Sequence, residues 1–271
     1  MGSSDILSAI VERKRRENER RQRHVAARGL ELVTGRPEAR GALAAERLRR
    51  AGSDLPRVIA EIKLRSPSAG EIRARRPGAV AEIAAGYVAG GAAAVSVLCD
   101  GPGFGGTPLD LRRASRATEA PLLFKEFVLC PLQVELARAM GAHMVLLLVR
   151  VLSHDELTTL VDAVLEHGMA PVVEAADDAE LDVALATRAT IVGVNARDLR
   201  TFQVDPERAA RAIERIPGDR IAVHMSGIKS AAALVEVGRG RADAALVGEG
   251  LMRADDPGAR LRSWLGEASG G

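Results

Sequence analysis

The stretch VIAEIKLRSPSAG, residues 58–70, begins as an apolar strand and ends in charged and turn-forming residues. Successive side chains of a strand point to opposite faces, so Glu61 and Lys63 share one face while Ala60 and Ile62 share the other. Ser, Pro and Gly then stop the strand. A buried strand that finishes with a carboxylate and an ammonium on one face indicates a functional site at its carboxyl end.

Apolar, β-branched runs of this kind recur along the chain, separated by Ala-, Leu-, Arg- and Glu-rich stretches with helical spacing. Strands are expected in eight runs, which start at Arg57, Ala93, Pro121, Met144, Ala170, Thr190, Arg220 and Asp243. The runs follow one another at roughly 20 to 35 residues, the length of one strand plus one helix. Eight such units predict an α/β fold, a closed (β/α)8 TIM barrel rather than an open sheet.

Residues 1–52 do not fit this repeat, and we expect them to form an N-terminal helical extension packed on a barrel of residues 53–271. Residues 5–32 and 37–51 both have the spacing of amphipathic helices. Residues 13–23 include seven basic and two acidic residues. Nucleic-acid binding is one interpretation of that run, but interleaved aromatic residues are absent, so a solvated helix face is favoured.

Composition narrows the functional classes. The chain has 271 residues, 47% of them hydrophobic, and a net charge of only +2, so it can bury a full core but offers no strong field for nucleic acid or an anionic membrane. It has no apolar run of about 18 residues and no signal-peptide pattern, so a cytoplasmic protein without membrane contacts is expected. Cys99 and Cys130 are far apart and the histidines lack ligand spacing, so no metal site is expected.

Active sites of (β/α)8 barrels form at the carboxyl ends of the strands. The residues at these ends are Glu61, Lys63, Lys125, Glu126, Glu174, Asn195, Arg197, Ser226, Gly227, Gly248, Glu249 and Gly250. Each one alone could mark where the chain reaches the surface. Together they place acids, bases and hydrogen-bond donors on one rim, and the last two turns lie where such barrels bind phosphate. A phosphorylated small molecule is therefore the expected ligand.

Two features of the second and third strand ends allow more than one interpretation. GPGFGG, residues 101–106, matches the G-x-G-x-x-G dinucleotide fingerprint. Pro102 removes a backbone donor, and the strand is the second of eight rather than the first of an open sheet, so dinucleotide binding is disfavoured. Phe104 and Phe127 could line an apolar slot or pack in the core, whereas Phe124 is expected in the core.

These segments together resemble the indole-3-glycerol phosphate synthase family over nearly the whole chain. The resemblance is carried, in family order, by VIAEIKLRSPSAG, SVLCDGPGFGG, LLFKEF, VVEAADDAEL, IVGVNARDLRTFQVD, SGIKS and ALVGEGLMRADDP. It implies an enzyme of tryptophan biosynthesis, a carbon–carbon lyase (carboxy-lyase). Such an enzyme closes the indole ring of 1-(2-carboxyphenylamino)-1-deoxyribulose 5-phosphate with loss of carbon dioxide and water, without metal or organic cofactor.

The resemblance also implies residue roles. Lys125 would be the general acid and Glu174 the base in the dehydration. Lys63 would bind the substrate carboxylate, and Glu61 would orient Lys63. Asn195 would bind a substrate hydroxyl. The expected substrate-binding residues are Phe104 and Phe127 for the aromatic ring, and Ser66, Arg197, Ser226, Gly227, Gly248 and Glu249 around the phosphate.

The chain departs from the family pattern at the end of the seventh strand, where ESGI is usual and this chain has HMSGI. Met225 takes the place of a glutamate that contacts the substrate, and His224 is expected to face the opposite way. A thioether can neither accept a strong hydrogen bond nor take a proton, so the lost contact would cost about 1.5 to 3 kcal/mol. Ala69, Glu126 and Ala196 replace the usual Lys, Asp and Asn.

Three functions are compatible with the sequence. The first is the ordinary synthase. The second is a paralogue with the same chemistry on a modified anilino-sugar phosphate in specialised metabolism, where Met225 would pack against an apolar substituent. The third is a non-catalytic barrel that binds a phosphorylated ligand, which the retained catalytic residues argue against. A monomer or a homodimer is expected.

Overall fold

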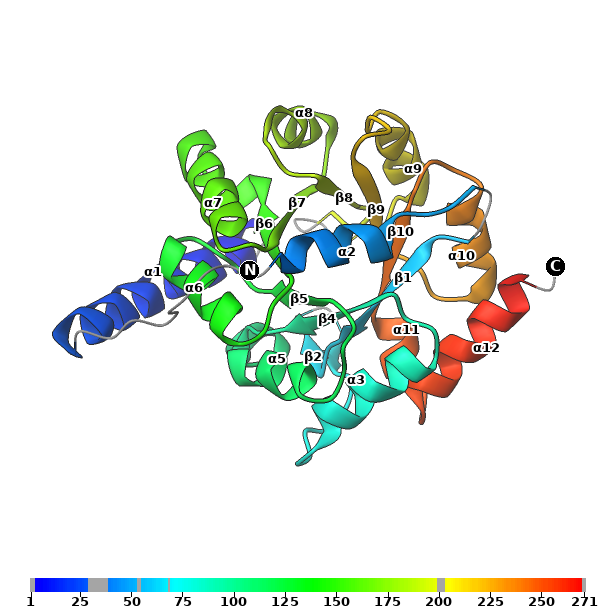
Figure 1. The fold of residues 1–271 in the computed structure, drawn as a ribbon, viewed down its shortest axis with the longest axis horizontal. Coiled ribbons are helices and arrows are strands. Elements are labelled where there is room, and N and C mark those ends of the chain that lie inside the picture. The colour runs from blue at the N-terminus through cyan, green and yellow to red at the C-terminus, as the bar shows by residue number, and fades with distance from the viewer. Residues whose placement is uncertain (1–2, 29–38, 53–54, 68, 199–202, 270–271) are drawn as a thin grey trace.

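The computed structural model describes residues 3–28, 39–52, 55–67, 69–198 and 203–269. In this part of the chain, eight parallel strands form a closed barrel in the order β1-β10-β9-β8-β7-β6-β5-β4 (Figure 1). Their bounds are β1 Arg57–Ile62, β4 Ala94–Leu98, β5 Leu122–Lys125, β6 Met144–Leu148, β7 Ala170–Ala175, β8 Ile191–Asn195, β9 Ile221–Met225 and β10 Ala244–Val247. Each predicted run contains one of these strands, so the predicted (β/α)8 barrel is confirmed. A short hairpin that the sequence did not indicate, β2 Arg65–Ser66 and β3 Gly70–Glu71, follows β1.

Helices surround the barrel (Figure 1). The longer ones are α3 Ala79–Ala89, α5 Pro108–Ser115, α6 Pro131–Ala139, α7 His154–Glu166, α8 Asp178–Ala186, α9 Pro206–Glu214, α10 Ala231–Gly238 and α12 Pro257–Ser269, and the short ones are α4 Gly101–Phe104, η1 Val149–Val151 and α11 Glu249–Met252. Capping side chains fix several starts, as where Thr107 accepts from the backbone N–H of Leu109 at 3.0 Å. None of the helices in the described part of the chain has the length and apolar character needed to span a bilayer.

The strands bury both of their faces in separate apolar layers. Inward-facing residues such as Ile59, Leu123 and Val172 fill the barrel. Outward-facing residues such as Val58 and Phe124 pack under the helices, and the expected core position of Phe124 is confirmed by its complete burial. Because both faces are buried, the strand ends are the places where polar side chains can gather without a large desolvation cost.

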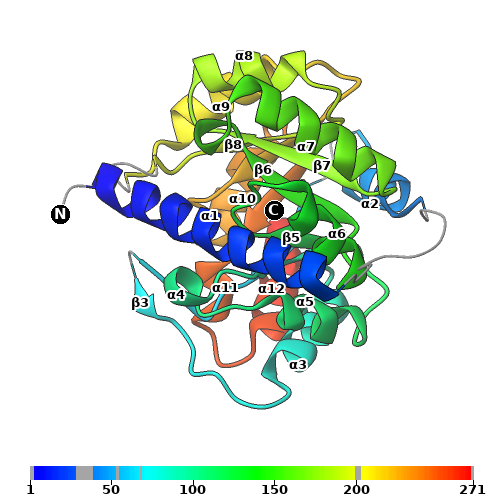
Figure 2. The ribbon, with the colours of Figure 1, turned by 90° about the vertical axis from the view of Figure 1, so that its left-hand side faces the viewer.

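The two N-terminal helices close the ends of the barrel. α2 Arg40–Leu48 lies at the amino ends of the strands, where the backbone N–H of Gly41 donates to the carbonyl of Gly168 at 2.9 Å. α1 Ser3–Arg28 lies across the carboxyl ends (Figure 2) and adds Ile10 to the interior apolar layer. Both predicted N-terminal helices are therefore present: α1 begins two residues earlier than predicted, and α2 ends three residues earlier. Residues 29–38, which include the predicted end of the first helix and the predicted start of the second, lie outside the described part.

The basic run at residues 13–23 is only partly the solvated face that its composition predicted. Lys14 is 2% exposed and Asn18 is 4% exposed. The Lys14 ammonium pairs with Asp100 and Glu126, which follow β4 and β5. The prediction is wrong for these two residues because their partners are distant in the sequence, and a local charge pattern cannot show them.

His224 lies on the outward face of β9, opposite to Met225, as predicted. It is 3% exposed, and among the described residues neither ring nitrogen has a hydrogen-bond partner. Burial lowers the pKa of His224 to about 4, whereas an exposed histidine in an unfolded chain has a pKa of about 6.5. The unfolded chain therefore binds the proton first, so His224 favours the unfolded state increasingly as the pH falls from about 6.5 to about 4.

The native protein is expected to lose stability between about pH 7 and about pH 4. Replacing His224 with Leu is expected to make that loss smaller by roughly 2 to 4 kcal/mol. Urea unfolding curves at a series of pH values measure this difference. His154→Gln is the matched control, because His154 is exposed. Parallel stability curves for the native protein and the Leu variant would show that His224 is not the titrating group.

Candidate active site

A pocket lies at the carboxyl ends of the strands, beneath α1. Its polar lining is Glu61, Lys63, Ser66, Lys125, Glu126, Glu174, Asn195, Arg197, Ser226 and Glu249, and its apolar lining is Ile6, Leu7, Ile10, Pro67, Leu98, Phe104, Phe127, Leu146, Leu148 and Leu246. The predicted site residues thus come together in one pocket. Met225, Gly227 and Gly248 are the exceptions, because they lie beside the pocket and not in its lining.

A larger hollow of about 1140 Å³ lies at the other end of the barrel, bordered by α2, α3, α10 and α12. Its lining includes Pro56 and Arg57, at the start of β1, and none of the predicted site residues. Since active sites of this fold form at the carboxyl ends of the strands, the pocket beneath α1 is the candidate active site.

Lys125, Glu174 and Asn195 form a hydrogen-bonded cluster at the ends of β5, β7 and β8. Lys125 Nζ donates to Glu174 Oε2 at 3.1 Å, and Asn195 Nδ2 donates to Glu174 Oε1 at 2.8 Å. The backbone N–H of Arg197 donates to Asn195 Oδ1 at 2.9 Å, which fixes the orientation of the amide. Both carboxylate oxygens are therefore held, and the carboxylate lies within proton-transfer distance of the ammonium.

The charge of Lys125 suits an acid. Burial lowers the pKa of Lys125, but attraction from the Glu174 and Glu61 carboxylates outweighs it and holds that pKa above its usual value. The lysine is therefore protonated at neutral pH. An ammonium in contact with a carboxylate can donate a proton to substrate and recover one from its neighbour.

Glu61 and Lys63 form a second pair at the end of β1, as their shared face predicted. Lys63 Nζ donates to Glu61 Oε1 at 3.0 Å, and Ser96 Oγ donates to Glu61 Oε2 at 3.4 Å. Burial raises the pKa of Glu61, but the Lys63 and Lys125 ammonium groups outweigh it and hold the pKa below its usual range. Glu61 is thus an ionised carboxylate that orients Lys63 toward the pocket.

Gly248 lies against Glu61, which explains why no side chain is present there. A Cβ atom at Gly248 would lie 2.9 Å from Glu61 Oε1 and 3.2 Å from Glu61 Cβ. The close approach to Glu61 is therefore what requires glycine at this position.

Gly248→Ala is expected to displace the Glu61 carboxylate and to lower kcat about 10-fold, because misplaced site groups lose their reactive geometry. Steady-state kinetics measure the effect. Gly218→Ala is the matched control, since a Cβ atom there would have no neighbour within 4 Å. Equal kcat values for the two variants would contradict this explanation of Gly248.

Met225 lies under the acid–base cluster. It is 1% exposed, belongs to the interior apolar layer, and has its Sδ 4.0 Å from Lys125 Nζ. Gly193 on the neighbouring strand β8 leaves space for it, because a Cβ atom at Gly193 would lie 2.8 Å from that sulfur. An apolar side chain thus fills a position within reach of the Lys125 ammonium.

Phe104 and Phe127 form a pair on one wall of the pocket. Their ring centroids are 6.2 Å apart and their planes are inclined by 38°. Ile6, Leu7 and Ile10 of α1 line the same pocket. Sequence reasoning missed these three residues. Their spacing indicates one face of a helix, but no local pattern shows where that face docks.

The glycine motif of residues 101–106 has a structural role. Asp100 caps α4, with its Oδ2 accepting from the backbone N–H of Gly103 at 2.9 Å. The negative carboxylate occupies the helix start that a pyrophosphate would need, and β4 belongs to a closed barrel. This geometry gives no support to dinucleotide binding.

The last two turns lie at the pocket beside Ser66 and Arg197. Ser226 and Gly227 have positive φ angles of 70° and 84°, so the chain turns sharply directly after β9. Glu249, at the start of α11, receives a 2.8 Å hydrogen bond from Arg253. Burial raises the pKa of Glu249, but this contact outweighs it and keeps the pKa below its usual value. The carboxylate is thus ionised and neutralised by Arg253.

The closed parallel barrel, with an acid–base cluster at the carboxyl ends of its strands, has the architecture of a (β/α)8-barrel enzyme. The family model described as indole-3-glycerol phosphate synthase matches residues 7–264. The chain is 42% identical over 265 residues to indole-3-glycerol phosphate synthase 2 of Streptomyces coelicolor, covering 97% of this chain and 100% of that protein. It is 43% identical over 268 residues to indole-3-glycerol phosphate synthase of Aromatoleum aromaticum, with the same coverage. The chain belongs to the indole-3-glycerol phosphate synthase family, as its motifs indicated.

Solved structures share the fold at low sequence identity. A mutant tryptophan synthase alpha-subunit from Pyrococcus furiosus has a TM-score of 0.59 and 14% identity, covering 79% of this chain and 98% of that one. A thiamine phosphate pyrophosphorylase from Pyrococcus furiosus has a TM-score of 0.57 and 15% identity, covering 83% and 98%. These similarities concern the barrel fold alone.

Proposed function

We propose that the protein converts 1-(2-carboxyphenylamino)-1-deoxyribulose 5-phosphate to indole-3-glycerol phosphate, with release of carbon dioxide and water, in tryptophan biosynthesis. The observation that carries this proposal is the hydrogen-bonded cluster of Lys125, Glu174 and Asn195 in a chain of this family. Ring closure needs an acid at a carbonyl oxygen, and dehydration needs an acid and a base at neighbouring atoms. The protein is accordingly a carboxy-lyase.

In the ring closure, the aromatic carbon that bears the carboxylate attacks the ketone carbon, and Lys125 protonates the ketone oxygen. The carboxylate then leaves as carbon dioxide, and its bonding electrons restore the aromatic ring. Lys63 holds this carboxylate before it leaves, and the 3.0 Å contact with Glu61 supports its orientation. An ammonium beside the carboxylate also keeps the substrate in the reactive geometry.

In the dehydration, Lys125 protonates the hydroxyl that leaves as water, and Glu174 removes a proton to form the new double bond of the indole. The 3.1 Å contact between the two side chains supports return of that proton to the lysine. Asn195 binds a substrate hydroxyl while it holds Glu174. Lys125 donates one proton in each half of the reaction. Glu174 returns one of them, and the other, which balances the loss of the carboxylate as neutral carbon dioxide, comes from solvent between the two steps.

The two ends of the substrate have separate binding groups in this proposal. Phe104 and Phe127 receive the aromatic ring, supported by their proximity and by the apolar residues around them. The phosphate binds between the turns after β9 and β10, to the groups Ser66, Arg197, Ser226, Gly227, Gly248 and Glu249, the last largely through its backbone. Positive φ angles at Ser226 and Gly227 support a turn whose backbone N–H groups face an anion.

Met225 favours a second candidate, the same reaction on a substrate whose aromatic ring carries an apolar substituent. The thioether is buried next to Lys125, where the usual family motif has a carboxylate. An apolar side chain can pack against an apolar substituent and offers nothing to a polar one. A cytoplasmic location and a monomeric or homodimeric state stay predictions.

Growth of a bacterial strain that lacks its own indole-3-glycerol phosphate synthase tests the proposal. The native chain is expected to restore growth without tryptophan, and Lys125→Ala is expected not to. Rescue by Met225→Glu but not by the native chain would favour the modified substrate. Failure of both at normal protein levels would contradict the proposed function.

A further inference from the structure

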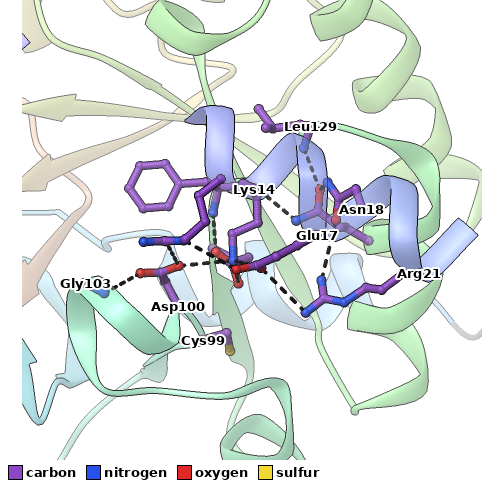
Figure 3. Close-up of polar contacts among 12 residues, drawn as sticks. Lys14, Glu17, Asn18, Arg21, Cys99, Asp100, Gly103 and Leu129 are labelled. Carbon is purple, nitrogen blue, oxygen red and sulfur yellow. Dashed lines mark hydrogen bonds and ion pairs between the residues drawn. The ribbon is translucent and has the colours of Figure 1, made fainter. Parts of the chain in front are cut away.

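A cluster of buried charges joins α1 to the loops after β4 and β5 (Figure 3). Lys14 Nζ lies 3.1 Å from Asp100 Oδ1, 3.1 Å from Glu126 Oε2 and 3.0 Å from Glu17 Oε2. Arg13 adds a second cation to Asp100, with its Nη2 2.5 Å from Oδ1. The side chains of Lys14, Asp100 and Glu126 are between 0% and 2% exposed. Water therefore does not stabilise these charges, and each is stabilised by its oppositely charged neighbours.

The choice of lysine at this position is informative. The chain has 38 Lys and Arg residues, of which only Lys14, Lys63, Lys125 and Lys229 are lysines. Two of the four, Lys63 and Lys125, line the pocket, and Lys14 is the third that is not exposed. The compact Lys14 ammonium has three donors, and it contacts three carboxylates, those of Glu17, Asp100 and Glu126. Burial lowers the pKa of Lys14, but Glu126 and Asp100 outweigh it and hold that pKa above its usual value, so the residue stays charged.

Each carboxylate that Lys14 holds also fixes a backbone segment that carries a phenylalanine. Asp100 Oδ2 accepts from the backbone N–H of Gly103 at 2.9 Å, and the next residue is Phe104. Glu126 Oε1 accepts from the backbone N–H of Phe127 at 2.8 Å. One ammonium thus connects the two turns that present the aromatic pair to the pocket.

A second contact from α1 holds the same loop one helical turn later. Asn18 Nδ2 donates to Gln133 Oε1 at 2.7 Å. That oxygen also accepts from the backbone N–H of Leu129 at 2.8 Å, and Gln133 Nε2 donates to the carbonyl of Phe127 at 2.8 Å. The backbone of Phe127 is therefore held on both sides by side chains that contact α1.

We propose that Lys14 is a positioning residue: through the two carboxylates it fixes the spacing of Phe104 and Phe127, and with it the slot that receives the aromatic ring of the substrate. The proposal rests on the proposed function for the identity of that ring. Lys14 touches neither substrate nor reacting atoms, and it acts on the aromatic end of the pocket. The phosphate end, built from the turns after β9 and β10, does not depend on it.

The test uses the full chain with 4-fluorophenylalanine at its four phenylalanines, so that fluorine NMR reports each ring separately. In Lys14→Met, the signals of Phe104 and Phe127 are expected to shift while that of the core residue Phe124 stays in place. The KM for the substrate is expected to rise about 10-fold, with kcat changed less than the KM. Arg16→Met is the matched control, because Arg16 lies on the same helix with its side chain 63% exposed.

Two binding probes separate the ends of the pocket. The Kd of the reduced substrate, whose ketone is an alcohol and cannot cyclise, is expected to rise about 10-fold in Lys14→Met. The Kd of inorganic phosphate is expected to stay within about twofold, a change too small to indicate a lost contact. Unchanged Phe104 and Phe127 signals with unchanged binding of the reduced substrate would overturn the positioning role.

Asn18→Ala serves as a milder variant if Lys14→Met does not fold. It loosens the same loop through Gln133, and it is expected to shift the Phe127 signal and leave Phe124 unchanged. No shift at Phe127 would overturn the proposal in this form too. Failure of the native chain to bind the reduced substrate would instead count against the proposed function, while the fluorine spectra would still decide whether Lys14 fixes the aromatic pair.

Discussion

Replacing Lys125 with Ala is expected to lower kcat by about 10²- to 10⁴-fold, the usual contribution of a positioned acid. The lysine is protonated in the native protein and is the proposed acid in both halves of the reaction. Its removal also leaves the buried Glu174 carboxylate without its 3.1 Å ion pair. Single-turnover kinetics with the unsubstituted substrate measure the loss in the chemical steps directly.

Lys229→Ala is the control, because it removes an exposed lysine that does not line the pocket. It is expected to retain native kinetics. Far-UV circular dichroism and the Tm of both variants separate a loss of chemistry from a loss of fold. A folded Lys125→Ala protein whose rate is within about 10-fold of the native rate would have lost less than a general acid contributes. That result would contradict the assignment of Lys125 as the acid.

Replacing Met225 with Glu is expected to raise kcat/KM for the unsubstituted substrate by about 10- to 100-fold, since a hydrogen bond to a charged group contributes about 1.5 to 3 kcal/mol. The new carboxylate would lie near Lys125, whose ammonium is 4.0 Å from the sulfur it replaces. That cation offsets part of the desolvation of the buried acid. Steady-state kinetics on the unsubstituted substrate and on a series with apolar ring substituents give the comparison.

Met225→Gln separates the effect of charge from that of size, because Gln has a similar length and no charge. A higher kcat/KM for Met225→Glu but not for Met225→Gln would show that the native chain lacks a carboxylate at this position that the reaction uses. A gain on the unsubstituted substrate together with a loss on the substituted series would identify Met225 as a specificity residue. No gain on any substrate, with the variant folded, would contradict the view that Met225 limits recognition.

Much of the fold and site followed from the sequence because the repeating units are local. Each strand is an apolar run followed by a polar end, and the barrel brings those ends to one rim. The Glu61–Lys63 pair illustrates this: their separation by two residues predicted a shared face, and the structure places them 3.0 Å apart. Lys125 and Glu174 come from different strands, so only the fold could bring them into contact.

What the sequence did not predict depends on contacts between distant segments. The sequence predicted the helix α1, but it did not predict that Lys14 contacts Glu126, which lies 112 residues later in the chain. The space requirement at Gly248 likewise became evident only when Glu61 was placed against it. The division of the chain at residue 52 stays a prediction. Because Ile6, Leu7 and Ile10 line the pocket, the N-terminal extension contributes to the site and is more than a cover for the barrel.

The most direct measurement uses the unsubstituted substrate labelled with ¹³C in its carboxylate, mixed with the purified native protein. Indole fluorescence and labelled carbon dioxide are followed together, with Lys125→Ala as the blank. The account predicts one carbon dioxide released for each indole formed, and neither product in the blank. Absence of both products from the native protein, while the reduced substrate still binds, would contradict the proposal that this barrel catalyses the synthase reaction.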